Sequence, residues 1–61
     1  TTLFRSVYVE FTAIGSVQKC TAIDGRTGVE VSVMGPITAA RHDMERLALA
    51  KLKRRLQQGA R

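Results

Sequence analysis

The sequence predicts an α+β domain in which a three-stranded antiparallel β-meander is followed by one C-terminal helix packed on one face of the sheet. Three observations lead to this β-β-β-α order. Apolar and polar side chains alternate in three short runs, turns containing glycine separate the runs, and residues 39–58 repeat apolar side chains at helical spacing. The 61 residues make a single domain, residues 1–61.

The first predicted strand spans residues 5–14, and residues 1–4 are expected to be a frayed terminus. Alternate apolar residues of this strand share one face: Val7, Val9, Phe11 and Ala13. The connection Gly15-Ser16 has glycine at its first central position, which suits a two-residue type II′ hairpin turn. Such a turn fixes how the first strand pairs with the next one.

The second predicted strand spans residues 17–23 and pairs with the first directly across this turn. That register places Cys20 and Ala22 beneath the apolar face of the first strand. Gln18 is the exception, because its polar side chain falls on the core side. We expect it to lie at the open end of the sheet.

The third predicted strand spans residues 29–34 and follows a connection rich in turn-forming residues, two glycines and an aspartate. If Ile23 pairs with Gly28 across a four-residue loop, Ala22 opposes Val29. Alternate valines then complete the apolar face: Val29, Val31 and Val33. A slip of one residue would expose these valines to water, so the agreement of three strands on one face supports the meander.

The predicted helix spans residues 39–58 and begins after Pro36, which ends the sheet because proline cannot donate to a strand pair. Thr38 is the best N-cap, and Asp43 is the alternative if the helix starts late. Gly59 suits the C-terminal end. The apolar stripe has helical spacing: Met44, Leu47, Ala48, Leu52 and Leu56.

Length and composition limit the class of protein. A chain of 61 residues buries only about 60% of its unfolded surface, so its core contributes roughly 3–5 kcal/mol. One cysteine excludes an intrachain disulfide, and with one histidine it cannot form a structural zinc site, so we expect no metal or cofactor. Self-association remains as a way to stabilise so small a core, which makes a homodimer one expectation.

Charge and hydropathy add further expectations. Ten Lys and Arg against five Asp and Glu give a net charge of +5, which can attract nucleic acid, anionic membrane or an acidic protein, or simply keep a small domain soluble. No apolar run approaches the roughly 20 residues that span a bilayer, so we expect no membrane partner. The lone cysteine and the lack of an apolar amino-terminal targeting segment favour a reducing, cytoplasmic setting.

The candidate catalytic groups are scattered. His42 and Asp43 are neighbours in sequence and do not face each other on a helix. The predicted register buries Cys20, where a thiol behaves as a small apolar group. Glu10 and Glu30 fall at matched height on the open face of the sheet, which would suit glycosidase chemistry only in a cleft, and so short a chain has little room for one. We therefore expect no enzyme and no small-molecule substrate.

Two surfaces remain as candidate interfaces. Four cations crowd one and a half turns of the predicted helix, and a fifth lies upstream of them: Lys51, Lys53, Arg54 and Arg55, with Arg46. They fit a solvated helix face, a contact with nucleic acid or a contact with an acidic protein. The open face of the sheet carries apolar residues near its two ends: Tyr8, Ile14, Val17, Ile23 and Met34. Such exposed groups are typical of an interface in a small domain, and Ile37 extends one end.

Three segments resemble a known family. They are residues 8–11, YVEF, residues 28–36, GVEVSVMGP, and residues 45–52, in the pattern ERLAxxKL. In these motifs the chain resembles a family of very short uncharacterised bacterial proteins, alphaproteobacterial in origin, over nearly its whole length. The resemblance implies one domain of constant length and brings no activity and no site residue.

The combined interpretation is a small non-enzymatic interaction module that binds a protein partner or a second copy of itself. The alternative is non-specific nucleic-acid binding through the basic face of the helix, at Arg46, Lys53, Arg54 and their neighbours. The open face of the sheet carries one lysine and two glutamates, which suits phosphates poorly. Nucleic-acid binding would therefore depend on the helix.

Overall fold

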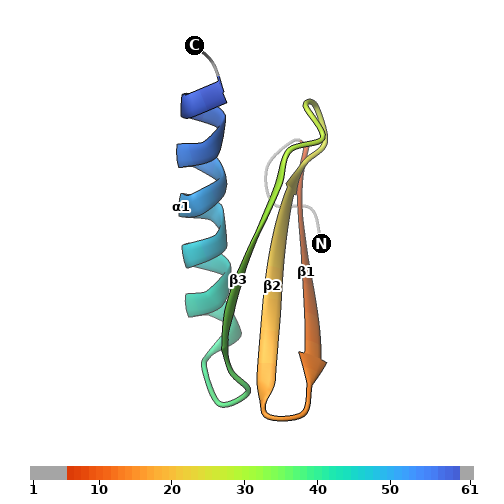
Figure 1. The fold of residues 1–61 in the computed structure, drawn as a ribbon, viewed down its shortest axis with the longest axis vertical. Helices are drawn as coiled ribbons and strands as arrows, with labels where there is room; N and C mark the ends of the chain where they lie inside the picture. The colour runs from red at the N-terminus through yellow and green to blue at the C-terminus, as the bar shows by residue number, and fades with distance from the viewer. Residues whose placement is uncertain (1–5, 60–61) are drawn as a thin grey trace.

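The computed structural model describes residues 6–59 and has the predicted β-β-β-α order (Figure 1). The elements are β1 (Val7–Ile14), β2 (Val17–Asp24), β3 (Glu30–Pro36) and α1 (Arg41–Gly59). The strands form one antiparallel sheet in the order β1-β2-β3, and α1 packs across β2 and β3. The domain therefore has two layers, a sheet and a helix, and β1 and β3 are edge strands. The frayed terminus predicted for residues 1–4 lies outside the described residues.

The β1–β2 hairpin has the predicted register. Ile14 pairs with Val17, and Val9 pairs with Ala22. Gly15 has a φ of 61°, whereas no non-glycine residue of the described chain has positive φ, which is the pattern of a type II′ turn. A two-residue turn leaves no freedom to slip, so the pairing follows along the whole hairpin.

The predicted register between β2 and β3 is wrong by two residues. Ala22 pairs with Val31 rather than Val29, and six residues separate the paired Ile23 and Glu30 instead of four. A shift of two residues keeps every side chain on its predicted face, because the period of a strand is two. The strand accordingly spans Glu30–Pro36 instead of residues 29–34.

The longer loop has a local cause in the buried Asp24. Its Oδ2 accepts hydrogen bonds from the backbone N–H of Thr27 at 3.1 Å and from the Thr27 hydroxyl at 2.7 Å. The Asp24 backbone N–H donates to the carbonyl oxygen of Val29 at 2.8 Å, and Gly28 has a φ of 78°. The aspartate thus closes the loop on itself and delays the start of β3.

The core lies between the sheet and α1. Its buried apolar residues are Val9, Cys20, Ala22 and Val31 from the sheet and Met44, Ala48 and Leu52 from α1. The predicted stripe is wrong at Leu47, which is 60% exposed, and Leu49 packs against the core instead. These two residues lie about 200° apart around the helix, on either side of Ala48, so only one of them can face the sheet. α1 is rotated so that Leu49 turns toward β1.

The helix also begins later than predicted. It starts at Arg41, with the backbone N–H of Met44 donating to the carbonyl oxygen of Ala40 at 3.1 Å. Neither Thr38 nor Asp43 occupies the position before the first helical residue. A tight turn precedes the helix instead, in which the Ala39 N–H donates to the Pro36 carbonyl oxygen at 2.9 Å.

Gln18 explains the position of this turn. Its side chain is only 5% exposed, and its Nε2 donates to the carbonyl oxygens of Pro36 at 3.0 Å and Ala39 at 2.8 Å. The polar residue predicted at the open end of the sheet is therefore buried, and it ties β2 to the connection between β3 and α1. This contact fixes where the helix enters the fold.

Candidate interaction surfaces

The open face of the sheet is the face turned away from α1. The first candidate surface is the end of this face beside the Gly15-Ser16 turn. Ile14, Val17 and Met34 lie together there around a shallow hollow of about 320 Å³, with Thr12 and Lys19 beside them. Ile14 is 76% exposed and Met34 is 68% exposed. The structure thus brings three of the five predicted interface residues into one patch, although they come from three strands.

The other two predicted interface residues, Tyr8 and Ile23, pair with each other near the opposite end of the same face. A polar row separates the two ends: Glu10, Thr21 and Ser32. Within it the hydroxyls of Thr21 and Ser32 are 3.0 Å apart. The open face therefore has apolar residues at both ends, with Glu30 beside Ile23 at one of them, and is polar in the middle.

The corrected register also separates the two glutamates of this face. Glu10 is in the row of Ser32, whereas Glu30 is in the row of Ile23. The predicted matched height of the two carboxylates is therefore wrong. Strand residues two positions apart are about 6.6 Å apart along the strand.

Several cations of α1 have partners within the fold. Lys51 Nζ donates to the carbonyl oxygen of Ser32 on the edge strand β3 at 2.8 Å. Arg46 lies 3.5 Å from the Asp43 carboxylate, an exposed pair that contributes little to stability. The Arg41 guanidinium, which the sequence interpretation did not single out, lies 4.9 Å from the centre of the Phe11 ring. Lys51 in particular covers part of an edge that could otherwise pair with another strand.

Lys53, Arg54 and Arg55 are exposed, and within residues 6–59 they make no ion pair. Because consecutive helical residues differ by about 100° in direction, these three point to different sides of α1. Lys53 lines a groove beside β1, and helix geometry places Arg54 and Arg55 about 100° and 200° further round α1. The predicted cation group does not form a single strip.

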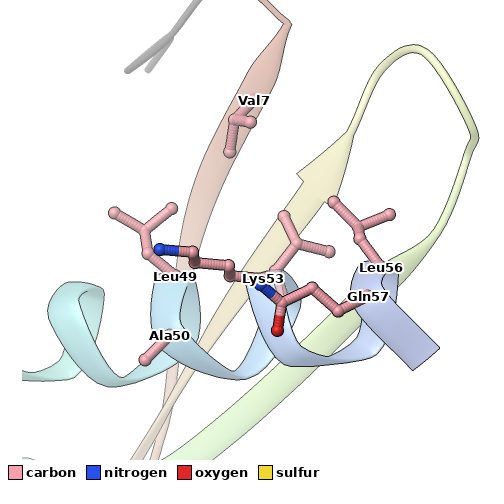
Figure 2. A pocket seen from close by; sticks show the side chains of 7 residues that line it. Val7, Leu49, Ala50, Lys53, Leu56 and Gln57 are labelled. Atoms are coloured by element: carbon pink, nitrogen blue, oxygen red, sulfur yellow. The ribbon is translucent and has the colours of Figure 1, made fainter. Parts of the chain in front are cut away.

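The sequence interpretation missed a second surface, an apolar groove between α1 and β1. It has a volume of about 610 Å³ and is lined by Val7, Leu49, Ala50, Leu52, Lys53, Leu56 and Gln57. Figure 2 shows Val7 of β1 facing Leu49 and Leu56 of α1, with Lys53 between them along the helix. The signal was present in the sequence, because Leu49 is spaced three and seven residues from Leu52 and Leu56.

The candidate catalytic groups are not brought together. Burial raises the pKa of the Cys20 thiol, and the Glu45 carboxylate raises that pKa further, so the thiol stays protonated at neutral pH. His42 is exposed at the start of α1. Among residues 6–59, no group of three His, Cys, Asp or Glu side chains could hold a metal ion. In the same part of the chain, no helix has the length and apolar character needed to cross a membrane.

The fold and its surfaces define a small β-β-β-α domain with an apolar patch on its open sheet face and an apolar groove beside its helix. A model of a domain of unknown function, DUF6898, matches residues 5–59, and the chain belongs to this family. The expected membership in a short family without an assigned activity is thereby confirmed. No curated protein and no solved structure matches the chain.

Proposed function

We propose that the chain is a non-enzymatic interaction module that binds a second copy of itself through the open face of its sheet. The observation that carries this proposal is the exposed group of Ile14, Val17 and Met34 on the face that α1 does not cover. Apolar side chains of this size in one exposed group are typical of interfaces. A small core also gains from the additional buried surface.

The arrangement of this face supports a second copy as the partner, because it is self-complementary. Its paired residues form four rows along the strands, from the row of Ile14 and Val17 to the row of Tyr8 and Ile23. A two-fold axis can run across the strands, midway along the face. It places the first row of one copy on the fourth row of the other, and the second row on the third. The end with Ile14 and Val17 then covers the end with Tyr8 and Ile23, as a symmetric interface requires, and Glu30 lies at the β3 margin of this contact.

The same axis brings opposite charges together. Lys19 lies in the second row and Glu10 in the third, on adjacent strands. In the dimer, Lys19 of one copy would therefore lie close to Glu10 of the other, and symmetry repeats the contact. Stacked sheets lie about 10 Å apart, a distance that these long side chains can span together.

The size of the face sets the expected affinity. Strands of eight residues and a width of three strands make a face of about 25 Å by 14 Å. Two such faces bury about 700 Å² in total, which is below the roughly 1,000 Å² of a stable specific interface, so we expect a weak, transient dimer with a dissociation constant of about 100 µM or more.

Sedimentation equilibrium over about 10 µM to 1 mM tests the proposal. The wild type should dimerise with concentration, and Ile14→Glu should remain monomeric because it places a carboxylate in the apolar contact. Leu47→Glu is the matched control, since it makes the same kind of exchange at an exposed site on α1. A wild type that stays monomeric at 1 mM, or equal effects of both variants, would contradict the proposal.

Non-specific nucleic-acid binding through α1 is the alternative function, and the exposed Lys53, Arg54 and Arg55 give it some support. It is less well supported because these cations point in different directions and Lys51 is bound to Ser32. Titration of labelled DNA and RNA at low and moderate salt tests it. Binding should weaken steeply with salt and be lost when Lys53 and Arg54 are both changed to Glu.

A further inference from the structure

The groove beside α1 follows from the dimensions of the two layers. Strands are spaced about 4.8 Å apart, and a packed helix needs about 8–10 Å of width. A helix placed over β2 and β3 therefore leaves the inner face of β1 with little cover. Val7 and Phe11 of β1 are accordingly only partly buried, although both point to the helix side of the sheet.

We propose that this groove is the docking site for an amphipathic helix of a partner protein, with acidic residues flanking the apolar face of that helix. The site is on the opposite side of the sheet from the self-association surface. This proposal can therefore be correct whether or not the chain forms the dimer.

The shape of the groove fits a helix. A second helix packed beside α1 at the usual separation of about 8–10 Å would lie directly over β1. α1 presents Leu49 and Leu56 on this side, seven residues or two turns apart, which is the spacing that interlocks with apolar residues of a neighbouring helix. An extended strand would instead lie beside β1 in the plane of the sheet, and would miss these leucines.

The charge of the groove favours an acidic partner. Lys53 lines it beside Gln57, and Arg46 lies on the same row of α1, seven residues before Lys53, where its exposed pair with Asp43 at 3.5 Å leaves it accessible to a partner. Among the described residues, those that line the groove include no carboxylate. Ala50 lies between the two cations of this row and leaves space there for a partner side chain. A helix with Asp or Glu beside its apolar face would meet these cations.

The same charges disfavour a second copy as the occupant. Two copies joined groove to groove would bring their α1 helices together, with Lys53 and Arg46 of each facing the same cations of the other. Like charges in contact across an interface cost affinity. The groove therefore suits a different protein, whereas the open face suits self-association.

A selection from random peptides identifies the class of partner. A displayed library of random 18-residue peptides is selected on the immobilised full chain and counter-selected on the Ala50→Glu variant. Ala50 is exposed and both residues favour helices, so this variant should fold normally. Enriched peptides should have apolar residues at positions i, i+3 or i+4, and i+7, with acidic residues beside them.

The most enriched peptide is then synthesised, labelled and titrated against variants of the whole chain. Lys53→Glu should weaken binding about five- to tenfold at low salt, which corresponds to reversing one exposed charge contact. A peptide with its acidic residues changed to lysine should regain binding to Lys53→Glu. Leu47→Glu adds a negative charge to the other side of α1 and should change the affinity less than twofold.

Any one of the following results would overturn the proposal. The selection could enrich nothing over the counter-selection, or it could enrich cationic peptides or peptides with strand periodicity. Leu47→Glu could weaken binding as much as Lys53→Glu. Ala50→Glu could abolish dimerisation in sedimentation, which would make a second copy the occupant. Nuclear Overhauser contacts from Leu49 and Leu56 to Leu3 or Phe4 in the free protein would mean that the chain fills its own groove.

Discussion

Replacing Gln18 should destabilise the fold, because its side chain ties β2 to the connection between β3 and α1. Its Nε2 donates to two carbonyl oxygens that lie 18 and 21 residues further along the chain, at 3.0 and 2.8 Å. In Gln18→Ala both carbonyls lose this donor. Each hydrogen bond contributes a net stabilisation of about 0.5–1.5 kcal/mol, so the free energy of unfolding should fall by about 1–3 kcal/mol.

The assay is urea denaturation followed by circular dichroism. With a slope near 1 kcal/mol per molar urea, as is usual for small domains, a loss of 2 kcal/mol lowers the midpoint by about 2 M. For a domain whose core contributes only roughly 3–5 kcal/mol, this is a large fraction of the total.

Gln18→Glu separates hydrogen bonding from packing, because it keeps the shape of the side chain. At neutral pH a carboxylate cannot donate to the two carbonyls and should destabilise the fold at least as much as alanine. In acid the protonated carboxyl can donate one hydrogen bond, so the variant should recover part of its deficit relative to wild type. If both variants unfold within 0.5 kcal/mol of wild type at neutral pH, Gln18 does not hold the start of α1.

Three further predictions concern the core, the loop and the orientation of α1. Cys20 should react with a thiol reagent only through unfolding, and the free energy of unfolding should fall above pH 9.0 by at most about 1.4 kcal/mol per pH unit. Stability falls with pH because burial raises the pKa of the folded thiol, so the unfolded chain loses the thiol proton first. In Cys20→Ala the free energy of unfolding should lack this pH dependence. Asp24→Ala should lose about 1–3 kcal/mol in urea denaturation, because two hydrogen bonds from Thr27 lose their acceptor, and Asp24→Asn should lose less. Ala48→Glu should prevent folding, as judged by circular dichroism, whereas Leu47→Glu should stay within about 0.5 kcal/mol of wild type.

The sequence was sufficient to predict the register of the β1–β2 hairpin and not that of β2 and β3. A two-residue turn with glycine at its first position allows one pairing, and Ile14 pairs with Val17 as predicted. The next loop can lengthen by two residues without moving any side chain to the other face, so the alternation of valines cannot distinguish four loop residues from six. The hydrogen bonds between Asp24 and Thr27 make that choice, and they depend on loop geometry.

The candidate surfaces were predictable to different degrees for similar reasons. Strand alternation places Ile14, Val17 and Met34 on one face regardless of the two-residue shift, so the open-face patch was found from the sequence. The groove was not, because it depends on which pair of strands α1 covers and on the rotation of the helix. Leu47 and Leu49 are both spaced to extend the helix stripe, and only the position of β1 decides between them.

Self-association through the open face is tested most directly by exchanging its charges and measuring dimerisation by sedimentation. Lys19→Glu and Glu10→Lys should each weaken the dimer about tenfold, because symmetry places two such contacts in every dimer. The double variant restores opposite charges and should dimerise within about twofold of the wild type. A double variant as weak as the two single changes combined would show that Lys19 and Glu10 do not meet across the interface.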